Sequence, residues 1–153
     1  MRSRDDTVPA AAAVERALSL GVCGMGGRLS RPPTSLTDAL VAVDALFGES
    51  FARRLERFVA VAPGAFVWTR DADGLGWLGR LTGPWRYDAA SDAVAADLVH
   101  VRPCDWLLTP IPPGELPRPV AESFARGGRN WQQIRAEGAA HDSAALWARH
   151  QGV

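Results

Sequence analysis

Aromatic and arginine side chains are concentrated in one segment of the chain, between Trp68 and Trp106. This segment holds four of the six Trp residues and the only Tyr, and these rings alternate with Arg70, Arg80, Arg86 and Arg102. Aromatic faces stack on nucleobases, and guanidinium groups bind phosphates. The segment therefore predicts a ligand that joins a flat heterocycle to phosphate. Packing is the alternative explanation, because Trp and Tyr also fill small β-cores.

The charge pattern restricts the possible chemistry. All seventeen basic side chains are Arg, and the formal net charge is zero. Without Lys, the phosphate-contacting lysine of a P-loop and the lysine of a Schiff-base site are absent in their usual form. A Gly-x-Ser-x-Gly nucleophile motif is also absent, so we expect a protein without catalytic activity. A net charge of zero further predicts that any nucleic-acid binding is local rather than spread over the surface.

The residues that hold metals and disulfides are few and scattered. Cys23 and Cys104 lie far apart in the sequence, and we interpret both as small, reduced core residues. His100, His141 and His150 do not have the spacing of a metal site. We therefore expect neither a metal nor a cofactor.

Length and hydropathy predict one domain over residues 1–153. A chain of this size buries enough surface for a core of its own. No apolar run approaches the roughly 20 residues of a membrane span. The N-terminal segment carries Asp5, Asp6 and the pair Glu15 and Arg16, which a secretory signal would not. These features predict a cytoplasmic protein that does not contact membranes.

The first part of the chain, about residues 9–62, has mainly helical patterns. A helix over 9–20 is expected to end at Gly21, and a short strand with a glycine-rich turn follows over 21–29. Ser35, with Asp38 three residues later, predicts the cap of the next helix. A further amphipathic helix is predicted over about 49–61.

The second part, about residues 64–135, is predicted to be rich in β-structure. Two β-favouring segments flank the turn at 71–74 and form a hairpin over 65–83. A loop rich in Asp and Ala follows Tyr87, and a long strand is expected over 97–106. Pro103 in that strand predicts a sheet edge, a bulge or a strand end. A proline-rich connector, a short helix over 120–124 and an extended piece over 130–134 precede a C-terminal helix over about 139–151.

These elements predict an α+β fold in which helices flank a small, bent, mostly antiparallel sheet. Three motifs occur in order: APGAFV at 62–67, GRLTGPWRY at 79–87 and HVRPCDW at 100–106. In this order they resemble the PUA-like superfamily, close to the EVE and YTH domains. The nearest resemblance is to the specificity modules of Mrr- and Mcr-type modification-dependent restriction systems. The resemblance implies a small PUA-like β-barrel.

The resemblance also implies a function and a set of site residues. Such a module reads a modified base, most directly one flipped out of DNA, as the targeting part of a defence system. Its nuclease or AAA-type effector would then lie on another chain. The implied base pocket comprises Trp85, Tyr87, Trp106, Arg102, Gly24, Met25 and Gly26. The implied phosphate-binding residues are Arg28, Arg80, Arg86, Arg126 and Arg129.

Three alternatives stay open on the sequence alone. An RNA-binding module of the same superfamily would use the same rings, because the 2′-OH is read by groups that the sequence does not reveal. A protein–protein adaptor would use exposed Trp and Arg side chains and the proline-rich connector at 110–119. A small hydrolase would pair His100 with Asp73, Asp88 or Asp105.

Overall fold

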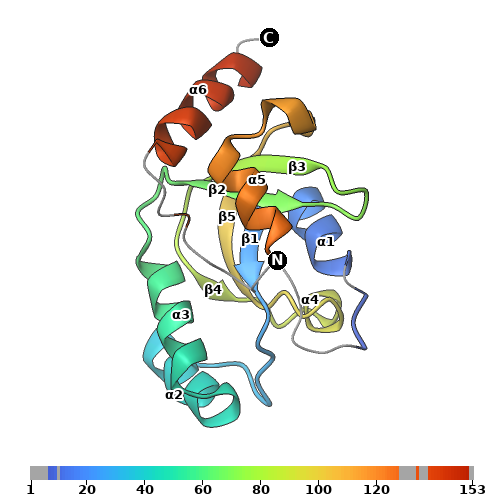
Figure 1. Ribbon diagram of the computed structural model, residues 1–153. Helices are drawn as coiled ribbons and strands as arrows, with labels where there is room; N and C mark the ends of the chain where they lie inside the picture. The colour runs from blue at the N-terminus through green and yellow to red at the C-terminus, as the bar shows by residue number, and fades with distance from the viewer. Residues whose placement is uncertain (1–6, 10, 128–133, 135–137, 152–153) are drawn as a thin grey trace.

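The structure is a computed structural model that describes residues 7–9, 11–127, 134 and 138–151. It is an α+β structure in which helices flank a curled antiparallel sheet (Figure 1). The elements along the chain are α1 (Ala12–Leu20), β1 (Val22–Met25), α2 (Leu36–Phe47), α3 (Glu49–Ala60), β2 (Phe66–Arg70), β3 (Gly76–Leu81), β4 (Arg86–Tyr87), α4 (Ser91–Ala95), β5 (His100–Trp106), the 3₁₀ turn η1 (Pro113–Glu115), α5 (Arg118–Ala125) and α6 (Ala139–Gln151).

Local signals in the sequence set several of these boundaries as predicted. Gly21 ends α1 in the left-handed conformation, at φ +67°, and its N–H donates to the carbonyl of Ala17. The Ser35 hydroxyl accepts the N–H of Asp38 at 3.0 Å and so caps α2. Both predicted ends are confirmed.

The predicted hairpin is also confirmed, and β2 and β3 form its two strands. Asp71 Oδ1 accepts the N–H groups of Asp73 at 3.0 Å and Leu75 at 2.9 Å. Gly74 supplies the positive φ, +83°, that the turn requires. The Trp77 indole donates to Asp71 Oδ2 at 2.8 Å, which ties the turn to the strand.

Strand β5 is the centre of the sheet rather than an edge. The strand order is β1-β5-β3-β2, and β4 also pairs with β5. Pro103 therefore does not mark an edge or a strand end, and those two of the three alternatives are wrong. Its carbonyl accepts the N–H of Thr82, just before the chain turns toward β4. The missing N–H of Pro103 thus faces the gap between β3 and β4, where it interrupts no ladder.

The Asp- and Ala-rich segment after Tyr87 is not entirely a loop, because it contains α4. Asp88 Oδ1 accepts the N–H of Ala90 at 3.1 Å, directly before the helix. Ala93 is fully buried, and Ala96 packs with alanines of α1. Small side chains allow this close packing. The predicted extended piece over 130–134 lies outside the described residues except for position 134.

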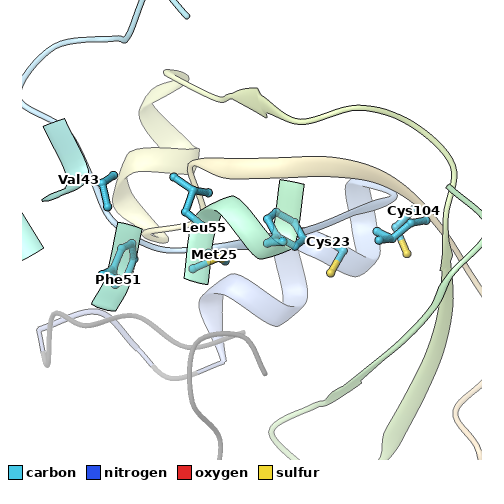
Figure 2. Close-up of a cluster of buried hydrophobic side chains, with 8 residues drawn as sticks. Cys23, Met25, Val43, Phe51, Leu55 and Cys104 are labelled. Carbon is cyan, nitrogen blue, oxygen red and sulfur yellow. The ribbon is translucent and has the colours of Figure 1, made fainter. Parts of the chain in front are cut away.

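The main core lies between the sheet and the pair α2 and α3. It contains the buried side chains Cys23, Met25, Val43, Phe51, Leu55, Phe58, Leu81 and Cys104 (Figure 2). Both cysteines are free and buried, which confirms their prediction as core residues. A second cluster packs α1 against β1 and β5, and a third, with Trp147, packs α6 against the hairpin.

Candidate functional site

The sheet brings residues from three strands together where β1 ends and β5 begins. Met25 of β1 pairs with His100 on one side of β5, and Tyr87 of β4 pairs with His100 on the other. Residues opposite one another in neighbouring strands project to the same face. The first residue of β5 is therefore the centre of this region.

Trp85, Tyr87 and His100 form a compact ring cluster. The rings of Trp85 and His100 are nearly parallel, with centroids 6.2 Å apart and an interplanar angle of 18°. The Trp85 indole donates to His100 Nδ1 at 3.4 Å. Tyr87 meets His100 edge-on, with centroids 5.4 Å apart. Trp85 and Tyr87 are half-buried and His100 is fully buried, so the cluster joins the core to the surface.

The glycine loop, residues 26–29, lies against the ring cluster. His100 Nε2 and the Gly27 carbonyl are 3.0 Å apart, and the Leu29 N–H donates to the Tyr87 hydroxyl at 3.0 Å. Gly27 has φ +113°, and a Cβ there would come within 2.9 Å of the Phe51 ring. This position therefore needs glycine, both for its conformation and for space.

Asp97 holds the loop from the other side. Its Oδ1 accepts the Gly27 N–H at 3.0 Å, and the residue is 3 % exposed. Asp97 itself adopts φ +48°, which Asp tolerates better than most residues. Asp97 was not identified from the sequence, and His100 was expected there only as a possible hydrolase residue. The signal was slight, because neither residue belongs to a local motif that indicates this role.

The three residues of β1 and the glycine loop that were expected to line the base pocket are buried in the fold. Gly24 pairs with Val101 inside the β1–β5 ladder. Met25 has no exposed surface and belongs to the main core. Gly26 packs against Asp97, since a Cβ there would lie 2.6 Å from its carboxylate. The strand extends further than the glycine pattern suggested, so the loop that meets the rings begins only after Met25.

Arg102 is buried rather than part of a pocket. It is 2 % exposed, and its guanidinium donates to the carbonyls of Phe58 at 2.9 Å, Val61 at 2.7 Å and Gly83 at 2.9 Å. Burial lowers its pKa from the ordinary Arg value, which is high enough that the group stays charged. Because side chains alternate along β5, Arg102 points into the core beside His100 and joins the end of α3 to the turn before β4.

Trp106 does not join the other predicted rings. It lies six residues beyond His100 along β5, which separates the two backbones by roughly 20 Å. Its indole donates to the Val22 carbonyl at 3.0 Å and its ring covers Gly79. Trp106 instead lines an open depression of about 530 Å³, together with Leu20, Gly21, Asp105, Leu108 and Trp147.

Of the predicted phosphate-binding arginines, Arg28 lies beside the ring cluster, whereas Arg86 projects to the opposite face of β4 from Tyr87. Arg28 belongs to the glycine loop, donates to the Val94 carbonyl at 3.3 Å and lies 3.9 Å from Asp97. Arg86 directly precedes Tyr87, its side chain is 56 % exposed, and it lies 3.8 Å from Asp88. Arg16 of α1, which was not predicted from the sequence, binds the same Asp88 at 3.2 Å. Arg16 and Arg86 thus share the Asp88 carboxylate on the side of the sheet that α1 covers.

The other predicted phosphate-binding arginines lie on different elements. Arg80 is exposed on β3, where it donates to the Gly64 carbonyl at 3.3 Å and covers the Phe66 ring. Arg126 is exposed at the end of α5. Arg129 lies outside the described residues. Among the described contacts, none joins Arg80 or Arg126 to the ring cluster.

The environment of His100 predicts a pH dependence of stability. Burial lowers the pKa of His100 to about 4, although Asp97 and the Gly27 carbonyl act in the opposite direction. The unfolded chain therefore binds a proton on this residue at a higher pH, near 6.5. The stabilisation is complete above pH 6.5 and is lost as the pH falls toward 4.

We expect the neutral ring to make the protein more stable at pH 8 than at pH 5 by about 2 kcal/mol. Urea unfolding at both pH values, for wild type and His100→Gln, measures this contribution as the difference between the two proteins. An equal pH dependence in the two proteins would contradict the assignment.

The described side chains that a hydrolase or a metal centre would need do not come together at the ring cluster. In the described contacts, His100 reaches Gly27, Trp85 and Tyr87, and none of them joins it to Asp73, Asp88 or Asp105. Over the described residues, no group of three His, Cys, Asp or Glu side chains is arranged to hold a metal ion.

No helix within the described part of the chain is both long enough and apolar enough to span a membrane. Comparisons with protein-family models, with curated proteins and with solved structures give no match.

Proposed function

We propose that this protein is a binding module that reads a modified nucleobase, with the ring cluster as its site. The observation that carries the proposal is that Trp85 and Tyr87 converge on His100 beside a glycine loop. Each of the three motifs on which the PUA-like resemblance depends contributes residues to the strands of the curled sheet. We assign that sheet to a small PUA-like barrel and its ligand to a base flipped out of DNA.

Stacking energies support a combination of rings and cations at this site. Flipping a base out of a duplex costs a few kcal/mol, and stacking on aromatic rings returns about 1–3 kcal/mol per base. The two terms nearly cancel, so phosphate contacts must supply the net affinity. Arg28 in the loop and Arg86, which is largely exposed on the other face of β4, are the cations that we assign to this role.

The described residues provide less support for an adaptor that uses exposed Trp side chains. Trp147 is buried, and Trp68, Trp77, Trp85 and Trp106 are half-buried. Trp131 lies outside the described residues. The half-buried indoles donate to partners within the fold, such as Ser143 for Trp68 at 3.0 Å. Their N–H groups are therefore satisfied within the fold, and only their ring faces are left for a ligand or partner.

The test is a panel of duplexes that differ by one modified base, together with matched RNA strands. We expect wild type to prefer a modified duplex, and Trp85→Leu to lose about tenfold or more of that affinity because it lacks the stacking face. Trp77→Leu is the matched control, since it removes an indole from the hairpin turn, and it should bind like wild type. Circular dichroism checks that both variants are folded.

Salt dependence tests the phosphate contacts separately. Replacing Arg86 with Gln should lower the slope of log affinity against log salt concentration by about one. Arg118, which is 90 % exposed on α5, provides a control, and Arg118→Gln should leave the slope unchanged. Equal binding of modified and unmodified strands would overturn the proposed function. A preference for RNA strands would reassign the module to RNA.

A further inference from the structure

Both backbone polar groups of Gly27 are held by side chains from the segment that leads into β5. Its N–H donates to Asp97 Oδ1 at 3.0 Å, and its carbonyl lies 3.0 Å from His100 Nε2. The Phe51 ring blocks the side on which a Cβ would stand. Gly27 is therefore fixed at three points, and it is where the glycine loop meets the core.

The partners of His100 determine its tautomer. The Gly27 carbonyl can only accept a hydrogen bond, so Nε2 carries the proton. The Trp85 indole N–H can only donate, so Nδ1 is the acceptor. One neutral imidazole thus contacts the loop through one nitrogen and the stacking ring through the other. A second proton on the ring would place two donors face to face at Trp85.

Burial favours the neutral state of His100, and the one described carboxylate near it, Asp97, acts in the opposite direction. Asp97 lies on its own segment, and Arg28 of the loop lies 3.9 Å from Asp97 and offsets its charge. Tyr87 faces the ring from β4, and its hydroxyl already accepts the Leu29 N–H. Phe51 of α3 and Met25 of β1 complete an apolar surround.

We propose that His100 is a positioning residue for the site. Through its neutral Nε2–H tautomer it fixes the position of the Trp85 ring relative to the glycine loop. The inference rests on the proposed function, because the relative position of the Trp85 ring and the glycine loop matters only if a ligand is held between them. His100 is itself fully buried and acts through Trp85 and Gly27. A base that stacks on Trp85 would then meet a loop already in place.

Two substitutions separate positioning from simple packing. His100→Gln keeps an amide that can donate to the Gly27 carbonyl and an oxygen that can accept from Trp85. His100→Phe keeps a ring of similar size but neither hydrogen bond. We expect His100→Phe to weaken binding of the preferred modified duplex about tenfold or more, and His100→Gln to recover most of that loss.

Nuclear magnetic resonance of the free protein provides a readout that needs no ligand. In ¹⁵N-histidine-labelled wild type, His100 should show the Nε2–H tautomer at pH 7 and no titration above pH 5. The Trp85 indole N–H, identified by its loss in Trp85→Phe, should exchange faster in His100→Phe than in wild type. The opposite tautomer, or a midpoint near the ordinary histidine value, would overturn the inference even if His100→Phe fails to fold.

The two proposals fail in different ways. If wild type shows no base preference but His100 has the expected tautomer, the proposed function is wrong and His100 positions no ligand site. If wild type shows the preference and a folded His100→Phe binds equally well, the function stands and the positioning role is overturned.

Discussion

Replacing Arg102 with Met is expected to lower the free energy of unfolding by about 3 to 4 kcal/mol, the largest effect that we expect of any single substitution. The buried guanidinium satisfies three carbonyls, those of Phe58, Val61 and Gly83. Met fills similar space but donates nothing, and each buried carbonyl left without a donor costs about 1–3 kcal/mol. Met also removes the free-energy cost of burying the guanidinium charge, and this gain offsets part of the loss from the three carbonyls.

Urea unfolding followed by circular dichroism measures this change, with attention to both midpoint and slope. Arg80→Met is the matched control, because Arg80 is exposed and makes one long bond to the Gly64 carbonyl. It should change stability by no more than about 0.5 kcal/mol. If the Arg102 and Arg80 variants unfold at the same urea concentration, the carbonyl contacts of Arg102 do not stabilise the fold.

Replacing Gly24 with Ala is expected to cost about 3 kcal/mol of stability. The added Cβ would lie 2.3 Å from the His100 carbonyl oxygen, and side-chain atoms of Val101 and Leu98 lie 3.0 Å and 3.1 Å away. Because the closest atom belongs to the backbone, β1 and β5 must separate to relieve the clash. That shift occurs at the first residue of β5, so binding at the ring cluster should fall as well.

Gly114→Ala is the control, because nothing lies within 4 Å of its added Cβ and its φ is not positive. This variant should be neutral or more stable by about 0.4–1 kcal/mol, because it restricts the unfolded chain. Thermal unfolding of the two alanine variants side by side gives the comparison. Equal midpoints would show that the sheet accommodates a methyl group at Gly24 without cost.

Structural features whose hydrogen bonds join residues close together in the chain could be predicted from the sequence. The cap at Ser35, the helix end at Gly21 and the hairpin turn at Asp71 each depend on hydrogen bonds between residues at most four apart. Side chain and backbone partner are then specified together. The α+β class followed from the same local patterns.

The composition of the site was only partly predictable. Trp85 and Tyr87 were identified as ring residues, and the structure places them together. Arg102 and Trp106 were assigned to the same pocket because both belong to the HVRPCDW motif on which the family resemblance depends. Side-chain alternation and the rise of an extended strand instead direct Arg102 into the core and carry Trp106 to the far end of β5.

Local patterns were thus sufficient for the helices, for the hairpin and for the concentration of rings and arginines from which a nucleobase ligand was inferred. Which of those side chains meet depends on how the strands pair, and that pairing added His100 and Asp97 to the site. Their contacts with Gly27 span 73 and 70 residues. The physical reason is that caps and turns are specified by nearby residues, whereas a site depends on strand register and burial, which join segments that no local pattern connects.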